Sequence, residues 1–117
     1  MIKNFKKLEI WKRSCRLVKM TYNATKGFPS EERFGLTSQM RRAAVSAPSN
    51  IAEGCGRKSN ADFCRFLDIS LGSLCELETQ FYLSCDLEFL TKQEMNALVS
   101  ETEQVRKMIA AYQNKMR

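Results

Sequence analysis

GLTSQMRRAAVSAPSNIAEGCGR, residues 35–57, has the residue spacing of an amphipathic helix with small residues on one face. At about 100° per residue, five apolar side chains fall within one narrow sector: Leu36, Met40, Ala43, Ala47 and Ile51. Pro48 removes a backbone donor and should loosen the helix, at a cost of about 3 kcal/mol in an ordinary helix. The stretch predicts a helix over residues 32–53, ended by Gly54 and Gly56.

A polar stripe lies beside this apolar sector, and its members are Gln39, Arg42, Ser46, Ser49, Asn50 and Glu53. These amide, guanidinium, hydroxyl and carboxylate groups suit a hydrogen-bonded network or the recognition of a polar partner. We favour a structural network, within one subunit or between subunits. We then expect Arg42 to hold a carboxylate, because a buried guanidinium without a partner is costly. The candidate carboxylates are Glu53, Glu76 and Glu78.

Apolar residues spaced three and four apart predict three more helices. The first covers residues 6–25, and its inward face is predicted from Leu8, Trp11, Cys15, Val18 and Tyr22. The third is capped by Ser59 or Asn60, and the fourth opens with a Thr91–Glu94 capping box. The chain is therefore predicted to be all-α: one domain over residues 1–117, folded as an antiparallel, up-down-up-down four-helix bundle.

The residue types limit the chemistry. The chain has no histidine, and its five cysteines include no C-x-x-C pair, so we expect no metal site. Ser-His and Cys-His nucleophiles are excluded, and no Gly-rich phosphate loop is present. We expect a non-enzymatic protein without a cofactor.

Hydropathy limits the location. No apolar run approaches the roughly 20 residues of a membrane span, and no apolar segment follows the charged N-terminus as in a secretory signal. We expect a cytoplasmic protein with no membrane partner.

Ile10 and Leu17 lie almost opposite the predicted inward face of the first helix. Apolar residues on an outer face suggest contact with another subunit, although isolated exposed apolar residues are common. These two residues are the candidate oligomer interface.

Charge is unevenly distributed along the chain. Residues 1–28 hold eight basic residues, Lys3 among them, against Glu9 alone, a net charge of +7. Residues 61–90 hold Arg65 against six acidic residues, a net charge of −5, while the whole chain carries +6. One interpretation is that the first helix pairs with the third, within a subunit or across an interface. The other is a nucleic-acid-binding surface, with phosphate contacts from Lys12, Arg13, Arg16, Lys19, Arg41, Arg57 and Lys58.

Several motifs resemble a bacterial family of four-helix bundle proteins first found encoded in intervening sequences of 23S ribosomal RNA genes. The similarity covers nearly the whole chain and is most specific in residues 38–54, the segment SQ-x-RRAAVS-x-PSNIAEG. Ala47 and Cys55 depart from the usual larger residues. The resemblance implies a ring-shaped homopentamer. A related accessory protein of diversity-generating retroelements is a basic pentamer that works with nucleic acid, which is an analogy only.

Three functions remain open at this stage. The first is an oligomer that binds RNA or DNA, structured RNA above all. No basic strip interleaved with aromatic residues is visible, so we do not expect sequence-specific reading of single strands. The second is a scaffold whose partner is another protein, and the third is an enzyme using the polar stripe with Glu76 or Glu78.

Overall fold

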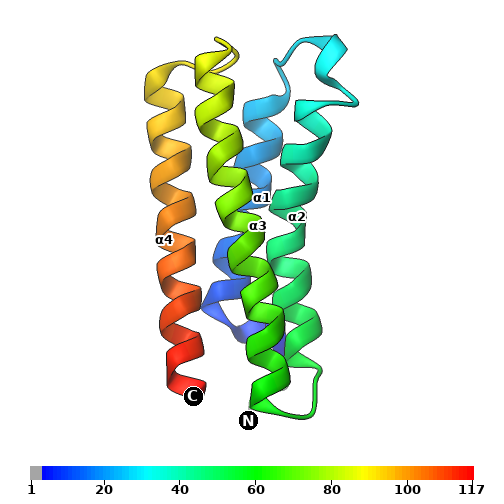
Figure 1. Ribbon diagram of the computed structural model, residues 1–117, viewed down its shortest axis with the longest axis vertical. Helices are drawn as coiled ribbons and strands as arrows, with labels where there is room; N and C mark the ends of the chain where they lie inside the picture. Colours follow the sequence, from blue (N-terminus) through cyan, green and yellow to red (C-terminus); the bar gives the residue numbers. More distant parts are fainter. Residues whose placement is uncertain (1–3) are drawn as a thin grey trace.

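The computed structural model describes residues 4–117 and contains four long helices, with no strand among the described residues. This confirms the all-α four-helix prediction (Figure 1). The elements in chain order are η1 (Phe5–Lys7), α1 (Glu9–Thr25), η2 (Ser30–Glu32), α2 (Leu36–Cys55), α3 (Asn60–Asp86) and α4 (Lys92–Met116). Lys3, which we counted in the basic part of the chain, lies outside the described residues.

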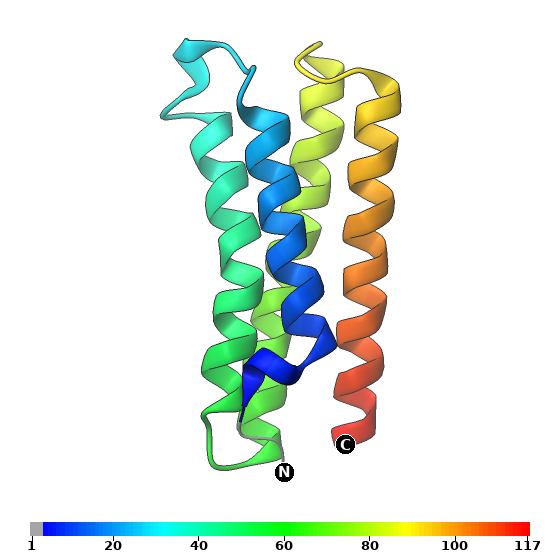
Figure 2. The ribbon, with the colours of Figure 1, turned by 180° about the vertical axis from the view of Figure 1, so that it is seen from behind.

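Successive helices run in opposite directions and form an elongated bundle of 44 × 24 × 20 Å (Figures 1 and 2). Each helix packs against two others: α1 and α3 both contact α2 and α4. Within residues 4–117, no Cα atom of α1 comes within 8 Å of one in α3. The predicted pairing of the basic first helix with the acidic third helix inside one subunit is therefore wrong, because the two are diagonal neighbours.

The helix starts follow their local chemistry. Thr91 Oγ1 accepts from the Glu94 N–H at 3.1 Å, and Glu94 Oε1 accepts from the Thr91 N–H at 2.8 Å, which confirms the capping box. Ser59 Oγ likewise accepts from the Asp62 N–H at 3.1 Å. α2 begins later than predicted, at Leu36, since residues 30–32 form a separate turn and the Glu32 carboxylate accepts from the Leu36 N–H at 3.1 Å.

α2 packs closely against α3 through small residues. The helix continues past the buried Pro48 to Cys55, and the Ala47 carbonyl accepts from Ser70 Oγ of α3 at 2.9 Å. Gly54 lies directly against α3: a Cβ at this position would be 2.8 Å from Phe63 Cδ1 and from Phe66 Cβ. The close approach predicted from the small residues is thus present.

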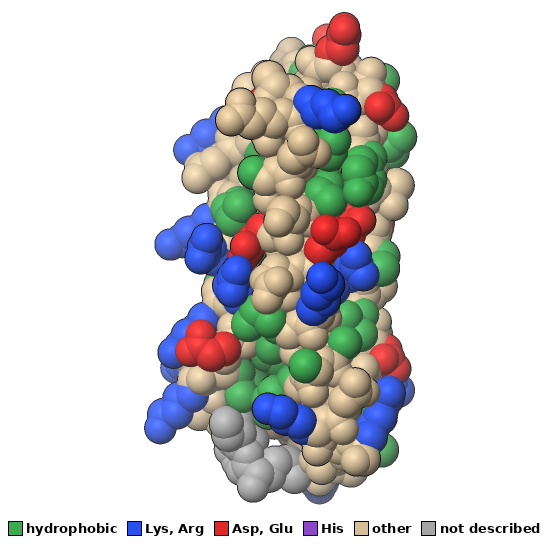
Figure 3. Space-filling view, turned by 90° about the vertical axis from the view of Figure 1, so that its left-hand side faces the viewer, with side chains coloured by type: hydrophobic (Ala, Val, Ile, Leu, Met, Phe, Trp, Pro, Cys, Tyr) green, Lys and Arg blue, Asp and Glu red, His purple; other side chains and the backbone are tan. Residues whose placement is uncertain are grey.

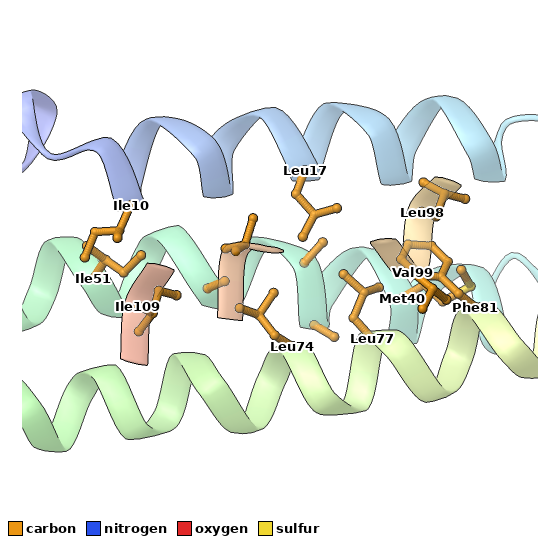
Figure 4. Packing of buried hydrophobic residues seen from close by; sticks show 14 of the residues in the cluster. Ile10, Leu17, Met40, Ile51, Leu74, Leu77, Phe81, Leu98, Val99 and Ile109 are labelled. Carbon is orange, nitrogen blue, oxygen red and sulfur yellow. The ribbon is translucent and has the colours of Figure 1, made fainter. Parts of the chain in front are cut away.

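The buried face of α1 differs from the prediction. Ile10 and Leu17, expected to face outward, are only 4% and 1% exposed and point into the core (Figure 4). From the predicted inward set, Trp11 is only half-buried and Tyr22 is 39% exposed. Ile10 and Leu17 are therefore core residues, and their assignment to an oligomer interface is wrong.

Hydroxyl groups explain this difference. The rest of the inward face of α1 consists of Ser14, Thr21 and Thr25, which read as polar in sequence but are buried. Thr21 Oγ1 donates to the Leu17 carbonyl and Thr25 Oγ1 to the Thr21 carbonyl, both at 2.8 Å. Because these hydroxyls are satisfied inside their own helix, burying them costs little.

None of the described helices has a run long and apolar enough to cross a membrane. Across residues 4–117, no disulfide joins the cysteines, and no group of three His, Cys, Asp or Glu residues is placed to hold a metal ion.

Candidate nucleic-acid interface

Four cations form a basic ridge along the outer face of α1: Lys12, Arg16, Lys19 and Lys26. Their spacings of four, three and seven residues place them on one side of the helix, opposite the buried Leu17, and all four are exposed. Lys and Arg side chains project along the edge of the bundle where α1 lies in Figure 3. The nearest acidic side chain on the same face is Glu9, 3.6 Å from Lys12 Nζ, in an exposed pair of little energetic weight. The ridge is therefore positive and open to solvent.

Arg13 does not belong to this ridge. Its Nε donates to Glu101 Oε2 at 2.6 Å and its Nη2 to Glu101 Oε1 at 3.1 Å, a bidentate pair that ties α1 to α4. The hydrogen bond to Glu101 raises the pKa of Arg13. We assign Arg13 to the architecture of the bundle.

Arg57 and Lys58 lie in the loop between α2 and α3. Arg57 Nη2 donates to Glu53 Oε2 at 3.2 Å, and its guanidinium lies 4.7 Å from the centroid of the Phe66 ring. Lys58 is exposed at the end of the bundle where α1 begins (Figure 2). The structure therefore brings together Lys12, Arg16 and Lys19 from the predicted contact set and engages Arg57 elsewhere.

The centre of the polar stripe is a hydrogen-bonded network between α2 and α3. Asn50 Nδ2 donates to the Ser46 carbonyl at 2.9 Å and to Ser46 Oγ at 3.0 Å. Ser73 Oγ of α3 donates to Ser46 Oγ at 2.8 Å. This part of the stripe has the structural role that we expected from its residue types.

Arg42 departs from the prediction. It is exposed, and no carboxylate among residues 4–117 lies within 4.0 Å of its guanidinium. The three candidate partners are engaged elsewhere: Glu53 with Arg57, Glu76 with Gln80 and Glu78 with Arg106. The buried Arg42 ion pair is therefore wrong. Position 42 lies on the outer side of α2, where water can solvate the guanidinium and no partner is needed.

Three arginines surround a surface groove that the sequence did not reveal. This arginine groove has a volume of about 590 Å³. It is lined by Tyr22, Arg33, Phe34, Thr37, Ser38, Arg41, Arg42, Val45 and Ser46. Arg41, a predicted phosphate contact, donates from Nε to Thr25 Oγ1 at 3.0 Å, and its guanidinium lies 4.4 Å from the Tyr22 ring centroid. The only local signal in the sequence was the Arg33-Phe34 pair just before α2.

Comparisons with known proteins agree with this architecture. A crystal structure of a protein with unknown function from the S23 ribosomal protein family of Bacteroides thetaiotaomicron superposes with a TM-score of 0.83. The two chains are 23% identical over 90% of this chain and 95% of the other, a likeness that shows the fold alone. Among the curated proteins, none matches. The model of the 23S rRNA-intervening sequence protein family matches residues 6–111, and the chain belongs to that family.

Proposed function

We propose that the protein is a non-enzymatic homo-oligomer that binds nucleic acid, structured RNA above all, through phosphate contacts of the basic ridge. The observation that carries this proposal is the exposure of Lys12, Arg16 and Lys19 on one face of α1. Lys12 and Lys26 are separated by fourteen residues of helix, about 21 Å at 1.5 Å per residue, so the ridge can meet several successive phosphates. The absence of histidine from the sequence supports a role without catalysis.

Long cationic side chains on a helix surface meet phosphates rather than base edges. Binding by the ridge should therefore depend steeply on salt and weakly on sequence. In an oligomer several ridges would engage one RNA, and avidity would compensate for the modest charge of each chain.

Charge and apolar exposure support assembly, with a pentamer implied by the family resemblance. Tyr82, Leu83 and Leu87 of α3 and its C-terminal end are exposed, and Asp86 and Glu88 lie among them in sequence. Because α1 and α3 do not meet within one bundle, their opposite charges can attract only between copies. A cytoplasmic location is supported by five cysteines that form no disulfide among the described residues.

Light scattering tests the assembly. We expect a mass of five times the 13.5 kDa of one chain at micromolar concentration. A monomer whose mass does not change with salt would contradict the oligomer, because both apolar burial and charge attraction would then be absent.

Charge reversal tests the binding. In the double variant R16E/K19E, we expect affinity for a structured RNA to fall by about tenfold or more at ~100 mM salt, with a shallower salt dependence. The matched control is K92E/K107E, which makes the same change in net charge at two exposed positions of α4. Gel shift across ~50–200 mM salt gives both quantities.

Equal losses in the two double variants would mean that net charge acts without a specific surface. Affinity that holds across the salt series contradicts phosphate-driven binding. Absence of binding even at the lowest salt would favour the alternative, a protein-interaction scaffold.

A further inference from the structure

We propose that the arginine groove is a subsite for an unpaired nucleotide, with its base on the Phe34 ring and its phosphates on Arg41 and Arg42. This inference rests on the proposed nucleic-acid binding and adds a preference for single-stranded over duplex segments. It also revises the expectation that the chain lacks aromatic residues among its cations.

The charge of the groove selects an anion. Arg33, Arg41 and Arg42 line it, and no carboxylate does. Thr37 and Ser38, in the first turn of α2, also belong to the lining, and that turn contains no acidic residue. The positive end of the α2 dipole therefore adds to the field of the three guanidiniums.

Two of the guanidiniums have donors to spare. Arg42 is exposed without a carboxylate partner among residues 4–117, as described above. Arg41 is held at a fixed place by Thr25 Oγ1 and the Tyr22 ring, and this hydrogen bond uses its Nε alone. A guanidinium positioned in this way can receive a phosphate with its terminal nitrogens, and the planar fork matches the phosphate oxygens.

Phe34 supplies an aromatic surface beside these cations. Its side chain is 89% exposed, the highest value among the exposed large hydrophobic residues of the described chain. The Arg33 guanidinium lies 5.3 Å from its ring centroid, so a planar cation already lies against the ring. Unpaired bases stack on exposed aromatic rings and on guanidinium planes, whereas bases in a duplex are already stacked on one another.

Position and size favour a nucleic acid as the occupant. Tyr22 belongs to α1, so the groove adjoins the basic ridge. A neighbouring hollow lined by Lys26, Arg33 and Arg41 connects the two surfaces. A strand whose phosphates follow the ridge would thus reach the groove without crossing an acidic surface. The volume of about 590 Å³ lies within the ~300–1,000 Å³ of small-molecule sites.

Phe34→Ala tests the subsite. Fluorescence anisotropy would measure affinity for a labelled 12-nucleotide single-stranded RNA and for the duplex of the same sequence. We expect Phe34→Ala to weaken single-strand binding by about tenfold, the loss of one stacked base, and to leave duplex binding unchanged. Phe34→Tyr should restore the affinity. The matched control is Leu87→Ala, which also shortens an exposed apolar side chain but lies far from the groove along the chain.

A 2-aminopurine placed in the strand gives a second readout. Its fluorescence should be quenched on binding to the natural protein and remain bright on binding to Phe34→Ala, because quenching reports stacking. Equal effects of Phe34→Ala on both RNAs, or none on either, would overturn the subsite. If R16E/K19E still lost both RNAs, the proposed function would stand alone.

Two other outcomes decide the remaining cases. A change in oligomer mass of Phe34→Ala by light scattering would place a second copy of this chain in the groove, which overturns the nucleotide subsite. Failure of the natural protein to bind either RNA at ~50 mM salt would overturn both this inference and the proposed function.

Discussion

Replacing Leu17 with glutamate is expected to unfold the protein rather than to dissociate an oligomer. Leu17 is 1% exposed in the core of the bundle. Truncating a buried leucine costs about 2–5 kcal/mol, and an unpaired buried carboxylate adds several more. Since a domain is stable by only about 5–15 kcal/mol, this single change removes most or all of that stability.

Tyr22→Glu is the matched control for Leu17→Glu. Tyr22 belongs to the face of α1 that the sequence predicts to be buried, yet it is 39% exposed, so a carboxylate there remains in contact with water. Circular dichroism during urea unfolding should show a folded Tyr22→Glu protein and little residual helix in Leu17→Glu. A folded Leu17→Glu protein that had merely lost its partners would return Leu17 to the subunit interface.

Alanine at Gly54 and at Gly72 should change stability in opposite directions. A Cβ at Gly54 would meet Phe63 and Phe66 of α3 at 2.8 Å, so α2 and α3 would have to separate. Overpacking of this kind costs about 1–3 kcal/mol and outweighs the gain of up to about 1 kcal/mol from the better helix propensity of alanine. We expect Gly54→Ala to lower the urea midpoint.

A Cβ at Gly72, in the middle of α3, meets nothing within 4 Å. Gly72→Ala should therefore keep the whole gain in helix propensity and raise the free energy of unfolding by about 0.5–1 kcal/mol. Thermal and urea unfolding of the two variants would measure the difference. Equal shifts at both sites would mean that α2 and α3 are not in the close contact described here.

These experiments divide the molecule as the proposals do. Leu17 and Gly54 test the core and the helix contacts, whereas Arg16, Lys19 and Phe34 lie on the surface and should change binding with little effect on folding. A variant of the second group that unfolds would carry no information on binding, so each binding measurement needs its circular dichroism spectrum.

The sequence by itself determined the number of helices, most of their limits and their caps. Ser59 and Thr91 cap helices because a side-chain oxygen, a following N–H and the start of an apolar pattern are all local features. The family could also be recognised at this level, from residues 38–54. Each of these properties depends on residues within a few positions of one another.

Only the tertiary structure decided which face of α1 is buried and where the functional surfaces lie. Periodicity gives the spacing of apolar residues, but it ranks Thr21 as polar and cannot register that its hydroxyl is satisfied by the Leu17 carbonyl. The exposed state of Arg42 depends on how α2 is rotated against α3. The arginine groove joins Tyr22 of α1 to residues 33–46, which meet only when two antiparallel helices pack side by side.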